Sequence, residues 1–240
     1  MNKEQQLIFM KQIFADYQLA VTQQQLEQLY RYYELLIETN QVMNLTAITE
    51  FEAVVYKHFI DSALLSRFID LSIELSVIDV GTGAGFPGLP LKILFPQLRI
   101  CLMDSLQKRV RFLQRVIDEL GLQDVEAVHY RAEEGGMLPQ YRDHFDLVVS
   151  RAVTSLPVLI EYQAPFAAQG GFCIAYKAND VDKEVETAAS AMRLLKVKTE
   201  KVDRYQLEDE NRALIFMKKI DATPKKFPRK AGTAKKEPLL

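Results

Sequence analysis

The chain has 240 residues, 48% of them hydrophobic, and a formal net charge of −2, so it is long enough to bury a core without disulfides. Its two cysteines, Cys101 and Cys173, lie in apolar segments that favour a reducing, cytoplasmic compartment, and its histidines lack metal-ligand spacing, which excludes disulfide-rich secreted and zinc-finger classes. No signal peptide is apparent and no apolar run approaches the roughly 20 residues of a membrane span, so we expect neither a membrane nor a metal partner.

Residues 1–70 carry helical patterns and are predicted to form an N-terminal cap. Apolar residues beginning at Met10 follow the i, i+3, i+4, i+7 spacing of one helix face. Thr22 and Gln25 form a capping box before a second apolar stripe, and a short helix is expected near 61–69. These stripes most simply face the core, and the alternative is a helix that binds a partner.

From residue 75 onward, short apolar runs alternate with helical stretches. Strands are expected at 76–81, 99–105, 125–130, 145–150, 171–176, 197–206 and 213–220, and helices at 88–95, 107–120 and 182–195. This alternation predicts an α/β fold, a doubly wound, Rossmann-like and mainly parallel sheet of about seven strands with helices on both faces. Ligands bind such sheets at the carboxyl ends of the strands. We therefore place the main domain at 71–220 and its site at the ends of the first four strands.

A glycine-rich loop, DVGTGAGFPG, begins at Asp79 and follows the first strand. Gly81, Gly83 and Gly85 let the backbone approach a ligand closely. A dinucleotide site would need glycine at position 86, where Phe86 stands, whereas an acid two residues before the first glycine is typical of S-adenosylmethionine sites. Asp79 would then accept a hydrogen bond from the ammonium group of the ligand, directly or through water. The alternative is a tight turn without a ligand.

The ends of the next three strands carry polar residues that suit such a ligand. Asp104 follows Gly81 by 23 residues, near the spacing at which an acid binds a ribose diol, although it also suits the start of the next helix. The acidic loop 131–134 follows the third strand and is placed to meet an adenine amino group, unless it is solvated surface. Arg151 follows the fourth strand and faces the same crevice, and the alternative is a structural salt bridge.

The absence of two sequence features reduces the number of methylation reactions that the site is expected to catalyse. No Asn/Asp-Pro-Pro-aromatic sequence follows the fourth strand, so methylation of exocyclic base amines is disfavoured. Neither cysteine lies in a loop from which it would attack a pyrimidine, so covalent catalysis of C5 methylation is disfavoured as well. Guanine N7 carries a free lone pair and no proton. Its in-line methylation needs alignment and exclusion of water but no obligatory general base.

Taken together, these residues resemble one family, the bacterial small-subunit ribosomal RNA guanine-N7 methyltransferase, also called glucose-inhibited division protein B. The resemblance rests on NLT at 44–46, HFIDS at 58–62, DVGTGAGFPGLP at 79–90, RAE at 131–133, SRA at 150–152 and FPRKAGTAKKEPL at 227–239. It implies a class I methyltransferase fold with an N-terminal helical extension. It also implies methyl transfer from S-adenosylmethionine to N7 of a guanine in 16S ribosomal RNA, with that RNA or the small subunit as partner. We expect a monomer.

The resemblance also implies roles for particular residues. Cofactor contacts are implied at Gly81, Phe86, Asp104, Ser105, Leu106, Ala132, Glu133 and Arg151. Arg131, Arg151, Lys177 and Arg229 are implied to lie near the RNA or the reacting groups, and the first two are the candidates for a catalytic role. Ala178 and Ala234 depart from the family, which usually has glycine and proline there.

The positive charge of the chain is concentrated at its C-terminal end. Residues 218–240 hold eight Lys/Arg and two Asp/Glu, a net of +6, and the remaining chain holds 22 basic and 30 acidic residues, a net of −8. A basic tail at 221–240 favours a polyanion partner such as RNA, and the alternative is a disordered, solubilising tail. The candidate RNA contacts are Lys225, Lys226, Arg229 and Lys230 in the tail, together with Lys108, Arg109, Arg131 and Lys177. For the cations of helix 107–120, the alternative is a solvated face.

Three other functions stay open at this point. A small-molecule methyltransferase would explain the glycine loop but not the basic tail. A non-catalytic RNA-binding or ribosome assembly factor would explain the tail without any methyl transfer. An NAD oxidoreductase is disfavoured because Phe86 replaces the third glycine of a dinucleotide loop.

Overall fold

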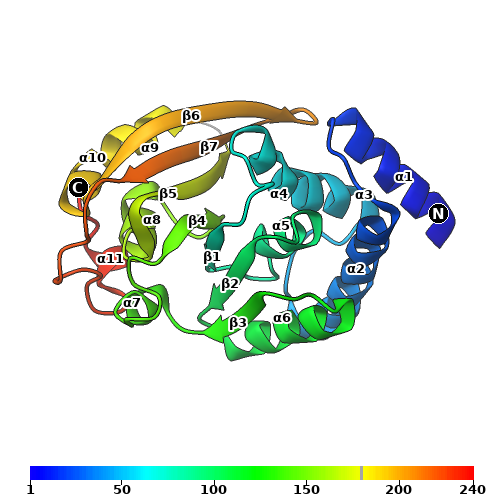
Figure 1. The fold of residues 1–240 in the computed structure, drawn as a ribbon, viewed down its shortest axis with the longest axis horizontal. Helices are drawn as coiled ribbons and strands as arrows, with labels where there is room; N and C mark the ends of the chain where they lie inside the picture. The colour runs from blue at the N-terminus through cyan, green and yellow to red at the C-terminus, as the bar shows by residue number, and fades with distance from the viewer. Residues whose placement is uncertain (179–180) are drawn as a thin grey trace.

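The computed structural model describes residues 1–178 and 181–240 and is built around one seven-stranded sheet (Figure 1). The strands are β1 (Ser76–Val80), β2 (Arg99–Asp104), β3 (Val125–His129), β4 (Phe145–Arg151), β5 (Ala167–Ala178), β6 (Val197–Leu207) and β7 (Glu210–Lys219). Their order is β3-β2-β1-β4-β5-β7-β6. Strand β7 runs antiparallel to both neighbours, and the pairs from β3 to β5 are parallel. The predicted doubly wound, mainly parallel sheet is therefore confirmed.

Helices cover both faces of the sheet. They are α1 (Lys3–Asp16), α2 (Gln23–Met43), α3 (Phe51–Val54), a π-helix (Val55–Ile60), α4 (Asp61–Ala63), a 3-10 helix (Leu64–Arg67), α5 (Gly88–Leu94), α6 (Gln107–Leu120), α7 (Ala132–Gly135), α8 (Leu156–Gln163), α9 (Val181–Thr187), α10 (Ala189–Leu194) and α11 (Thr233–Lys236). Figure 1 shows α1 to α6 on one side of the sheet and α8 to α11 on the other. Among the described residues, no helix is both long and apolar enough to cross a bilayer.

The alternation of side chains along β1 divides the interior into two cores. Val77 belongs to a core with α2, α5 and α6, whereas Ile78 and Val80 belong to a core with α8 and α10. Because both faces are buried, β1 carries apolar residues on both faces, at Val77, Ile78 and Val80, instead of a regular alternation with polar residues. The N-terminal helices share the first core with β1 and β2. The division into domains at residue 70 stays a prediction.

Several helices differ from those that the sequence pattern predicts. Helix α8 was not predicted, because all eight of its residues are buried and no polar face gives it a helical period. The single helix expected at 182–195 is two helices, α9 and α10, that meet at Ala188. The short helix expected near 61–69 begins earlier, as the π-helix, α4 and the 3-10 helix in succession.

The C-terminal tail is folded onto the second core. Phe227 and Ala234 are buried with the residues of α8, and α11 packs against that helix. Arg142 donates hydrogen bonds to the carbonyl oxygens of Thr223 (2.8 Å) and Phe227 (2.9 Å). The fully buried Lys219 ammonium donates to the hydroxyl of Thr223 at 2.6 Å. The disordered-tail alternative is therefore wrong.

Candidate active site

The glycine-rich loop after β1 is fixed by the end of β2. The backbone N–H groups of Gly81 and Thr82 donate to the carbonyl oxygen of Met103, at 2.9 and 3.1 Å. The N–H of Gly83 donates to Oδ2 of Asp104 at 2.9 Å. Gly81 (φ 73°) and Gly83 (φ 63°) adopt the left-handed conformation, which other residues adopt at a cost of about 1–2 kcal/mol. Glycine at these positions therefore lets the loop turn back onto β2.

Asp79 is fully buried beneath this loop. Its Oδ2 accepts hydrogen bonds from the Thr82 hydroxyl (2.6 Å) and the Gly88 N–H (2.9 Å). Its Oδ1 is also buried and has no hydrogen-bond partner among the described residues. Burial raises the pKa of Asp79 to about 6, against the opposing effects of those two hydrogen bonds and the charge of Arg151. A buried carboxylate oxygen without a donor is costly, so Oδ1 is an acceptor for a hydrogen-bond donor that the described residues do not supply.

Asp104 connects the glycine loop to the segment that begins α6. Its Oδ1 accepts from the N–H of Leu106 at 2.9 Å, while its Oδ2 accepts from Gly83. The Arg109 guanidinium lies 3.4 Å from the same Oδ2. Each carboxylate oxygen has two lone pairs, so Asp104 can organise both loops, bind Arg109 and still accept from one ligand hydroxyl through Oδ1.

A pocket of about 160 Å³ opens at the carboxyl ends of β1, β2 and β3. Its lining includes Gly81, Ser105, Ala132 and Glu133, which come from three different strand ends. Leu106 follows Ser105 and exposes 42% of its surface, although most leucines of the chain are buried. The structure therefore brings together residues that the sequence placed at separate strand ends.

The C-terminal tail forms another part of this pocket, which sequence reasoning missed. Gly232 and Lys235 line the pocket, and the N–H of Gly232 donates to Oε1 of Glu133 at 2.8 Å. Arg229 binds the fully buried Glu161 of α8, with Nε 2.9 Å from Oε1 and Nη2 2.6 Å from Oε2. Arg229 therefore anchors the tail beside the pocket, and its contact with RNA stays a prediction.

Arg151 lies at the end of β4 beside a second cavity, of about 190 Å³. Val153 lines both cavities, so the two are neighbours. The second cavity also contains Lys177 and Arg212. The Lys177 ammonium donates to Glu184 (2.7 Å) and to a backbone carbonyl oxygen, so it is held in place. The structure thus brings Arg151 and Lys177 together at one cavity, and their place near the RNA or the reacting groups stays a prediction.

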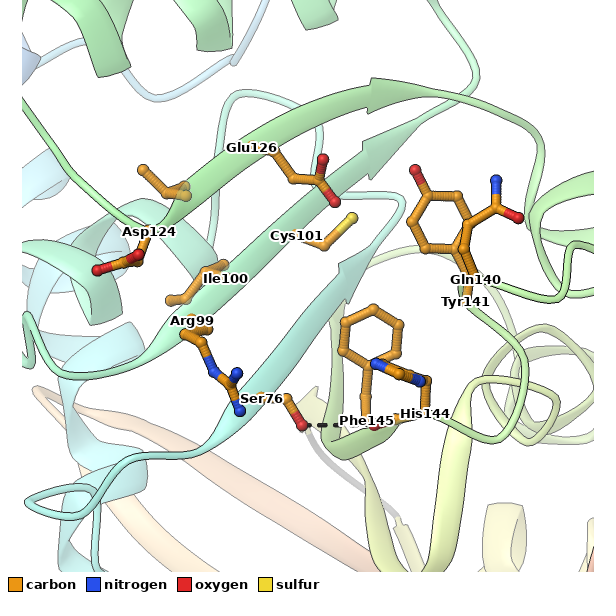
Figure 2. Close-up of a pocket in the computed structure, with 11 residues that line it drawn as sticks. Ser76, Arg99, Ile100, Cys101, Asp124, Glu126, Gln140, Tyr141, His144 and Phe145 are labelled. Carbon is orange, nitrogen blue, oxygen red and sulfur yellow. Dashed lines mark hydrogen bonds between the residues drawn. The ribbon is translucent and has the colours of Figure 1, made fainter.

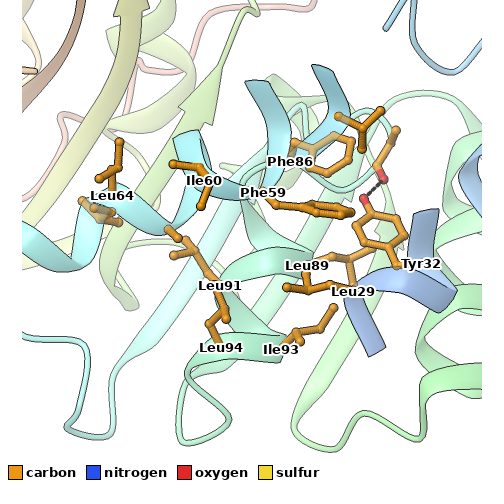
Figure 3. Close-up of a cluster of buried hydrophobic side chains, with 14 of the residues drawn as sticks. Leu29, Tyr32, Phe59, Ile60, Leu64, Phe86, Leu89, Leu91, Ile93 and Leu94 are labelled. Atoms are coloured by element: carbon orange, nitrogen blue, oxygen red, sulfur yellow. Dashed lines mark hydrogen bonds between the residues drawn. The ribbon is translucent and has the colours of Figure 1, made fainter. Parts of the chain in front are cut away.

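Phe86, implied as a cofactor contact, has a ring that is buried under the loop with only 5% of the residue exposed. Figure 3 shows it beside Phe59 and Tyr32, and the centroids of the Tyr32 and Phe86 rings are 5.3 Å apart. The Tyr32 hydroxyl donates to the carbonyl oxygen of Ala84 in the loop. The N-terminal helices therefore support the glycine loop from below.

The remaining cationic candidates lie at the surface. Exposed side chains include Lys108, Arg131, Lys225, Lys226 and Lys230. The structure places Arg131 in the lining of the 160 Å³ pocket. These residues are free to meet a large polyanion, and their role in RNA binding stays a prediction.

A larger cavity, of about 510 Å³, lies away from this site (Figure 2). Its lining includes Ser76, Arg99 and Val125, which begin β1, β2 and β3, so it opens at the amino ends of the strands. Cys101 also lines it, and burial raises the pKa of this thiol, which keeps it protonated. No group of His, Cys, Asp or Glu side chains suited to a metal ion occurs within residues 1–178 and 181–240.

Gly85→Ala is expected to destabilise the fold by roughly 2–4 kcal/mol, because Gly85 combines a positive φ of 105° with close packing. A Cβ there would lie 2.4 Å from Cδ1 of Leu89 and 2.8 Å from the Tyr32 hydroxyl. Urea unfolding measures the loss. Gly121→Ala is the control, since Gly121 has a φ of 62° but nothing within 4 Å of its Cβ position. If both variants lost the same free energy of unfolding, packing under the loop would contribute nothing to the cost of Gly85→Ala.

Comparison with known proteins agrees with this geometry. The family model described as rRNA small subunit methyltransferase G (GidB) matches residues 25–215. Ribosomal RNA small subunit methyltransferase G of Brevibacillus brevis is 45% identical over 242 residues, covering 100% of both chains. The protein of the same description from Acetivibrio thermocellus is 48% identical, covering 90% of this chain and 89% of its own.

Among solved structures, a SAM dependent methyltransferase from Aquifex aeolicus shares the fold, with a TM-score of 0.52 and 19% identity over 68% of this chain and 92% of that one. That similarity shows the class I methyltransferase fold alone. The sequence relatives show more than the fold, because the Brevibacillus brevis protein matches this chain from end to end and the Acetivibrio thermocellus protein matches 90% of it. With the resemblance thus confirmed, the chain belongs to the rRNA small subunit methyltransferase G family.

Proposed function

We propose that the protein transfers a methyl group from S-adenosylmethionine to N7 of a guanine in 16S ribosomal RNA. The observation that carries this proposal is the buried Asp79 oxygen without a donor, beneath a glycine loop, in a chain of the rRNA small subunit methyltransferase G family. A ribosomal substrate places the enzyme in the bacterial cytoplasm. One chain contains both cavities, which supports action as a monomer.

The lining of the 160 Å³ pocket, which includes Gly81 and Glu133, supports S-adenosylmethionine as its ligand. Asp79 and Asp104 do not line the pocket but adjoin Val80 and Ser105, which do. Asp79 offers its unpartnered oxygen to the ammonium group, and Gly81 lets the backbone approach the ligand. Asp104 and Glu133 offer acceptors to the ribose and the adenine amino group. The remaining proposed contacts are Gly83, Gly85, Phe86, Ser105, Leu106, Ala132 and Arg151. When bound, this cofactor supplies a methyl group made electrophilic by its positively charged sulfur.

The 190 Å³ cavity beside Val153 is the proposed place for the target guanine. Arg151, Lys177 and Arg212 line it, and their N–H groups suit the O6 oxygen of guanine and nearby phosphates. The Nε of Arg212 is buried and has no acceptor among the described residues, so it is one donor in need of a partner. The side chains need to align N7 and exclude water. No side chain needs to remove a proton, because N7 carries none.

The proposal is tested by incubating the protein with labelled S-adenosylmethionine and small ribosomal subunits, followed by nucleoside analysis of the RNA. We expect the label in 7-methylguanosine from 16S rRNA. Naked 16S rRNA and large subunits, assayed in parallel, define the form of the substrate. Label on a base amine, a ribose or a protein would contradict the N7 assignment.

Charge reversal in the tail is expected to weaken RNA binding and to flatten its dependence on salt. Lys225→Glu with Lys226→Glu removes two exposed cations, so the slope of log K against log salt should fall by up to about 2. Arg229 is left unchanged because it binds Glu161. Binding to a 16S fragment is measured by fluorescence anisotropy at several salt concentrations.

The matched control reverses two exposed lysines of α1, Lys3 and Lys11, at the opposite end of the molecule from α11 (Figure 1). This variant has the same change in net charge. An equal loss of affinity in both variants would show a general effect of charge and would remove the tail from the RNA interface.

A further inference from the structure

Arg151 is held by a segment that precedes it by about 90 residues. Its Nη1 donates to the carbonyl oxygen of Lys57 (2.9 Å) and to Oδ2 of Asp61 (2.8 Å). Its Nη2 lies 2.9 Å from Nδ1 of His58. These partners belong to the π-helix and α4, and only 12% of the Arg151 side chain is exposed. Arg151 is therefore positioned by the N-terminal helices.

Two contacts at Nδ1 of His58 bear on the tautomer of its ring. Nδ1 lies 3.1 Å from the Lys57 carbonyl oxygen, but that oxygen already accepts from Arg151, whereas an arginine N–H can only donate. We therefore infer that Nδ1 accepts from Arg151 and that the ring proton is on Nε2. That nitrogen lies 3.1 Å from the hydroxyl oxygen of Thr46, which serves as its acceptor. Burial, together with the charge of Arg151, lowers the pKa of His58 to about 3. His58 is therefore neutral with one defined proton position, and it offers Arg151 an acceptor without a charge.

The same groups reach the glycine loop. The His58 ring stacks on Phe86, with centroids 4.2 Å apart and an interplanar angle of 18°. The guanidinium carbon of Arg151 lies 5.2 Å from the centroid of Phe86, within the range of a cation–π contact. The end of β4, the loop after β1 and the π-helix therefore meet at Arg151.

Asp61 extends this network to the second cavity. Its Oδ1 accepts from the hydroxyl of Tyr205 at 2.8 Å, while its Oδ2 accepts from Arg151. Only 2% of Asp61 is exposed, so its carboxylate compensates a nearly buried guanidinium charge. Three of the five N–H donors of Arg151 are bound within the described residues, which leaves two to face a ligand.

We propose that His58 and Asp61 are positioning residues for methyl transfer: they hold the Arg151 guanidinium in the wall of the 190 Å³ cavity and direct its two remaining donors toward the reacting groups. His58 lines neither cavity, and Asp61, which lines the 190 Å³ cavity, acts through its bond to Arg151. The N-terminal helices would then complete the active site, in addition to supporting its loop. This inference rests on the proposed function, because its kinetic readout is methyl transfer.

A first test needs no variant and no reaction. In the protein labelled with ¹⁵N-histidine, long-range ¹⁵N–¹H spectra report the tautomer and charge of each ring. We expect one of the three histidines to be neutral with its proton on Nε2 and to show no titration between about pH 5.5 and 8. This signal should disappear in His58→Gln. A His58 ring with the proton on Nδ1, or one that titrates near its ordinary pKa, would overturn the proposal, even in an enzyme that methylates 16S rRNA.

The second test is a double-mutant cycle of Asp61→Asn and Arg151→Gln. At saturating cofactor and RNA we expect each single change to lower kcat about 10-fold to 100-fold, and the double variant to be no slower than Arg151→Gln alone. If the decrease in kcat of the double variant equalled the product of the two single decreases, Asp61 would not act through Arg151. Melting temperatures of all variants show whether each remains folded. Lack of methylation by the parent protein would instead contradict the proposed function.

Asp146→Asn is the matched control for this cycle. Asp146 lies near the start of β4 and binds the N–H of Ser76 (2.8 Å) and its hydroxyl (2.6 Å), at the opposite end of the strand from Arg151. The chemical change is the same, a carboxylate that accepts two hydrogen bonds to an amide, although Asp61 is buried and Asp146 is partly buried. We expect a lower melting temperature with kcat unchanged. A fall in kcat equal to that of Asp61→Asn would show that general loosening of β4 explains both.

Discussion

Gly81→Val is expected to abolish cofactor binding by this protein while the fold persists. Gly81 has a φ of 73°, and a Cβ there would lie 3.0 Å from Cγ2 of Val153, on the wall of the 160 Å³ pocket. A branched side chain at this place would fill the space that the loop leaves for a ligand. We expect the dissociation constant to rise by at least about 100-fold, or roughly 3 kcal/mol. Calorimetric titration with S-adenosylhomocysteine, the demethylated product, measures it.

Gly121→Val is the control for backbone strain. Gly121 ends α6 with a φ of 62°, and nothing lies within 4 Å of its Cβ position. The variant should lose stability, because a branched residue is unfavourable in the left-handed conformation, but its affinity for the ligand should match that of the parent. If Gly81→Val kept the parental affinity, the ligand would not lie over the first glycine of the loop. If both variants lost affinity equally, the loss would come from strain alone.

Local sequence signals account for much of the fold. The apolar runs predicted β1 and β2 because parallel strands buried on both faces need no polar alternation. Helix α6 was predictable from its single apolar stripe and from Gly121, which supplies the left-handed residue that ends it. Helix α8 was not predictable in this way, since burial on every side removes the polar face that marks a helix in sequence.

The residues of the candidate site also fall into two groups: those that local sequence patterns predicted and those that they did not. Asp79, Asp104 and Glu133 were found because each lies at or just after the carboxyl end of a strand, and the carboxyl ends of parallel strands share one edge of a sheet. The tail contacts were not found: Glu133 and Gly232 are 99 residues apart in the chain. A contact of this kind depends on where the tail packs, which no local pattern encodes. For the same reason the resemblance marked His58 as a family signature but gave no partner for it.

Asp79→Asn is expected to weaken cofactor binding and to remove a pH-dependent loss of stability. The amide oxygen of Asn can still accept from Thr82 and Gly88, so the loop keeps its hydrogen bonds. The amide N–H group then takes the place of the unpartnered Oδ1, which is the proposed acceptor for the ammonium group of the ligand. Two donors would then face each other. We expect a loss of about 1–3 kcal/mol in binding.

In the parent protein, the ionisation of Asp79 lowers the free energy of unfolding as pH rises. Burial raises the pKa of Asp79 from 3.8 to about 6, so between these values the folded state binds more protons than the unfolded state. The free energy of unfolding contributed by this group therefore falls as pH rises through that window, by an amount on the order of 3 kcal/mol above pH 7. Asp79→Asn lacks this component. Urea unfolding at about pH 4 and pH 7.5 should show that the free energy of unfolding of Asp79→Asn rises relative to that of the parent as pH rises.

Ligand binding should depend on pH in the same window, because only an ionised Asp79 attracts an ammonium group. As pH falls from about 7 to 5, the ionised fraction falls close to tenfold, and the parental affinity for S-adenosylhomocysteine should fall with it. The affinity of Asp79→Asn should stay constant across that range. A parent and a variant with parallel profiles would place the ammonium group away from this carboxylate. The unpartnered Oδ1 would then be a cost of the loop itself, and the strongest structural argument for a sulfonium cofactor at this site would be lost.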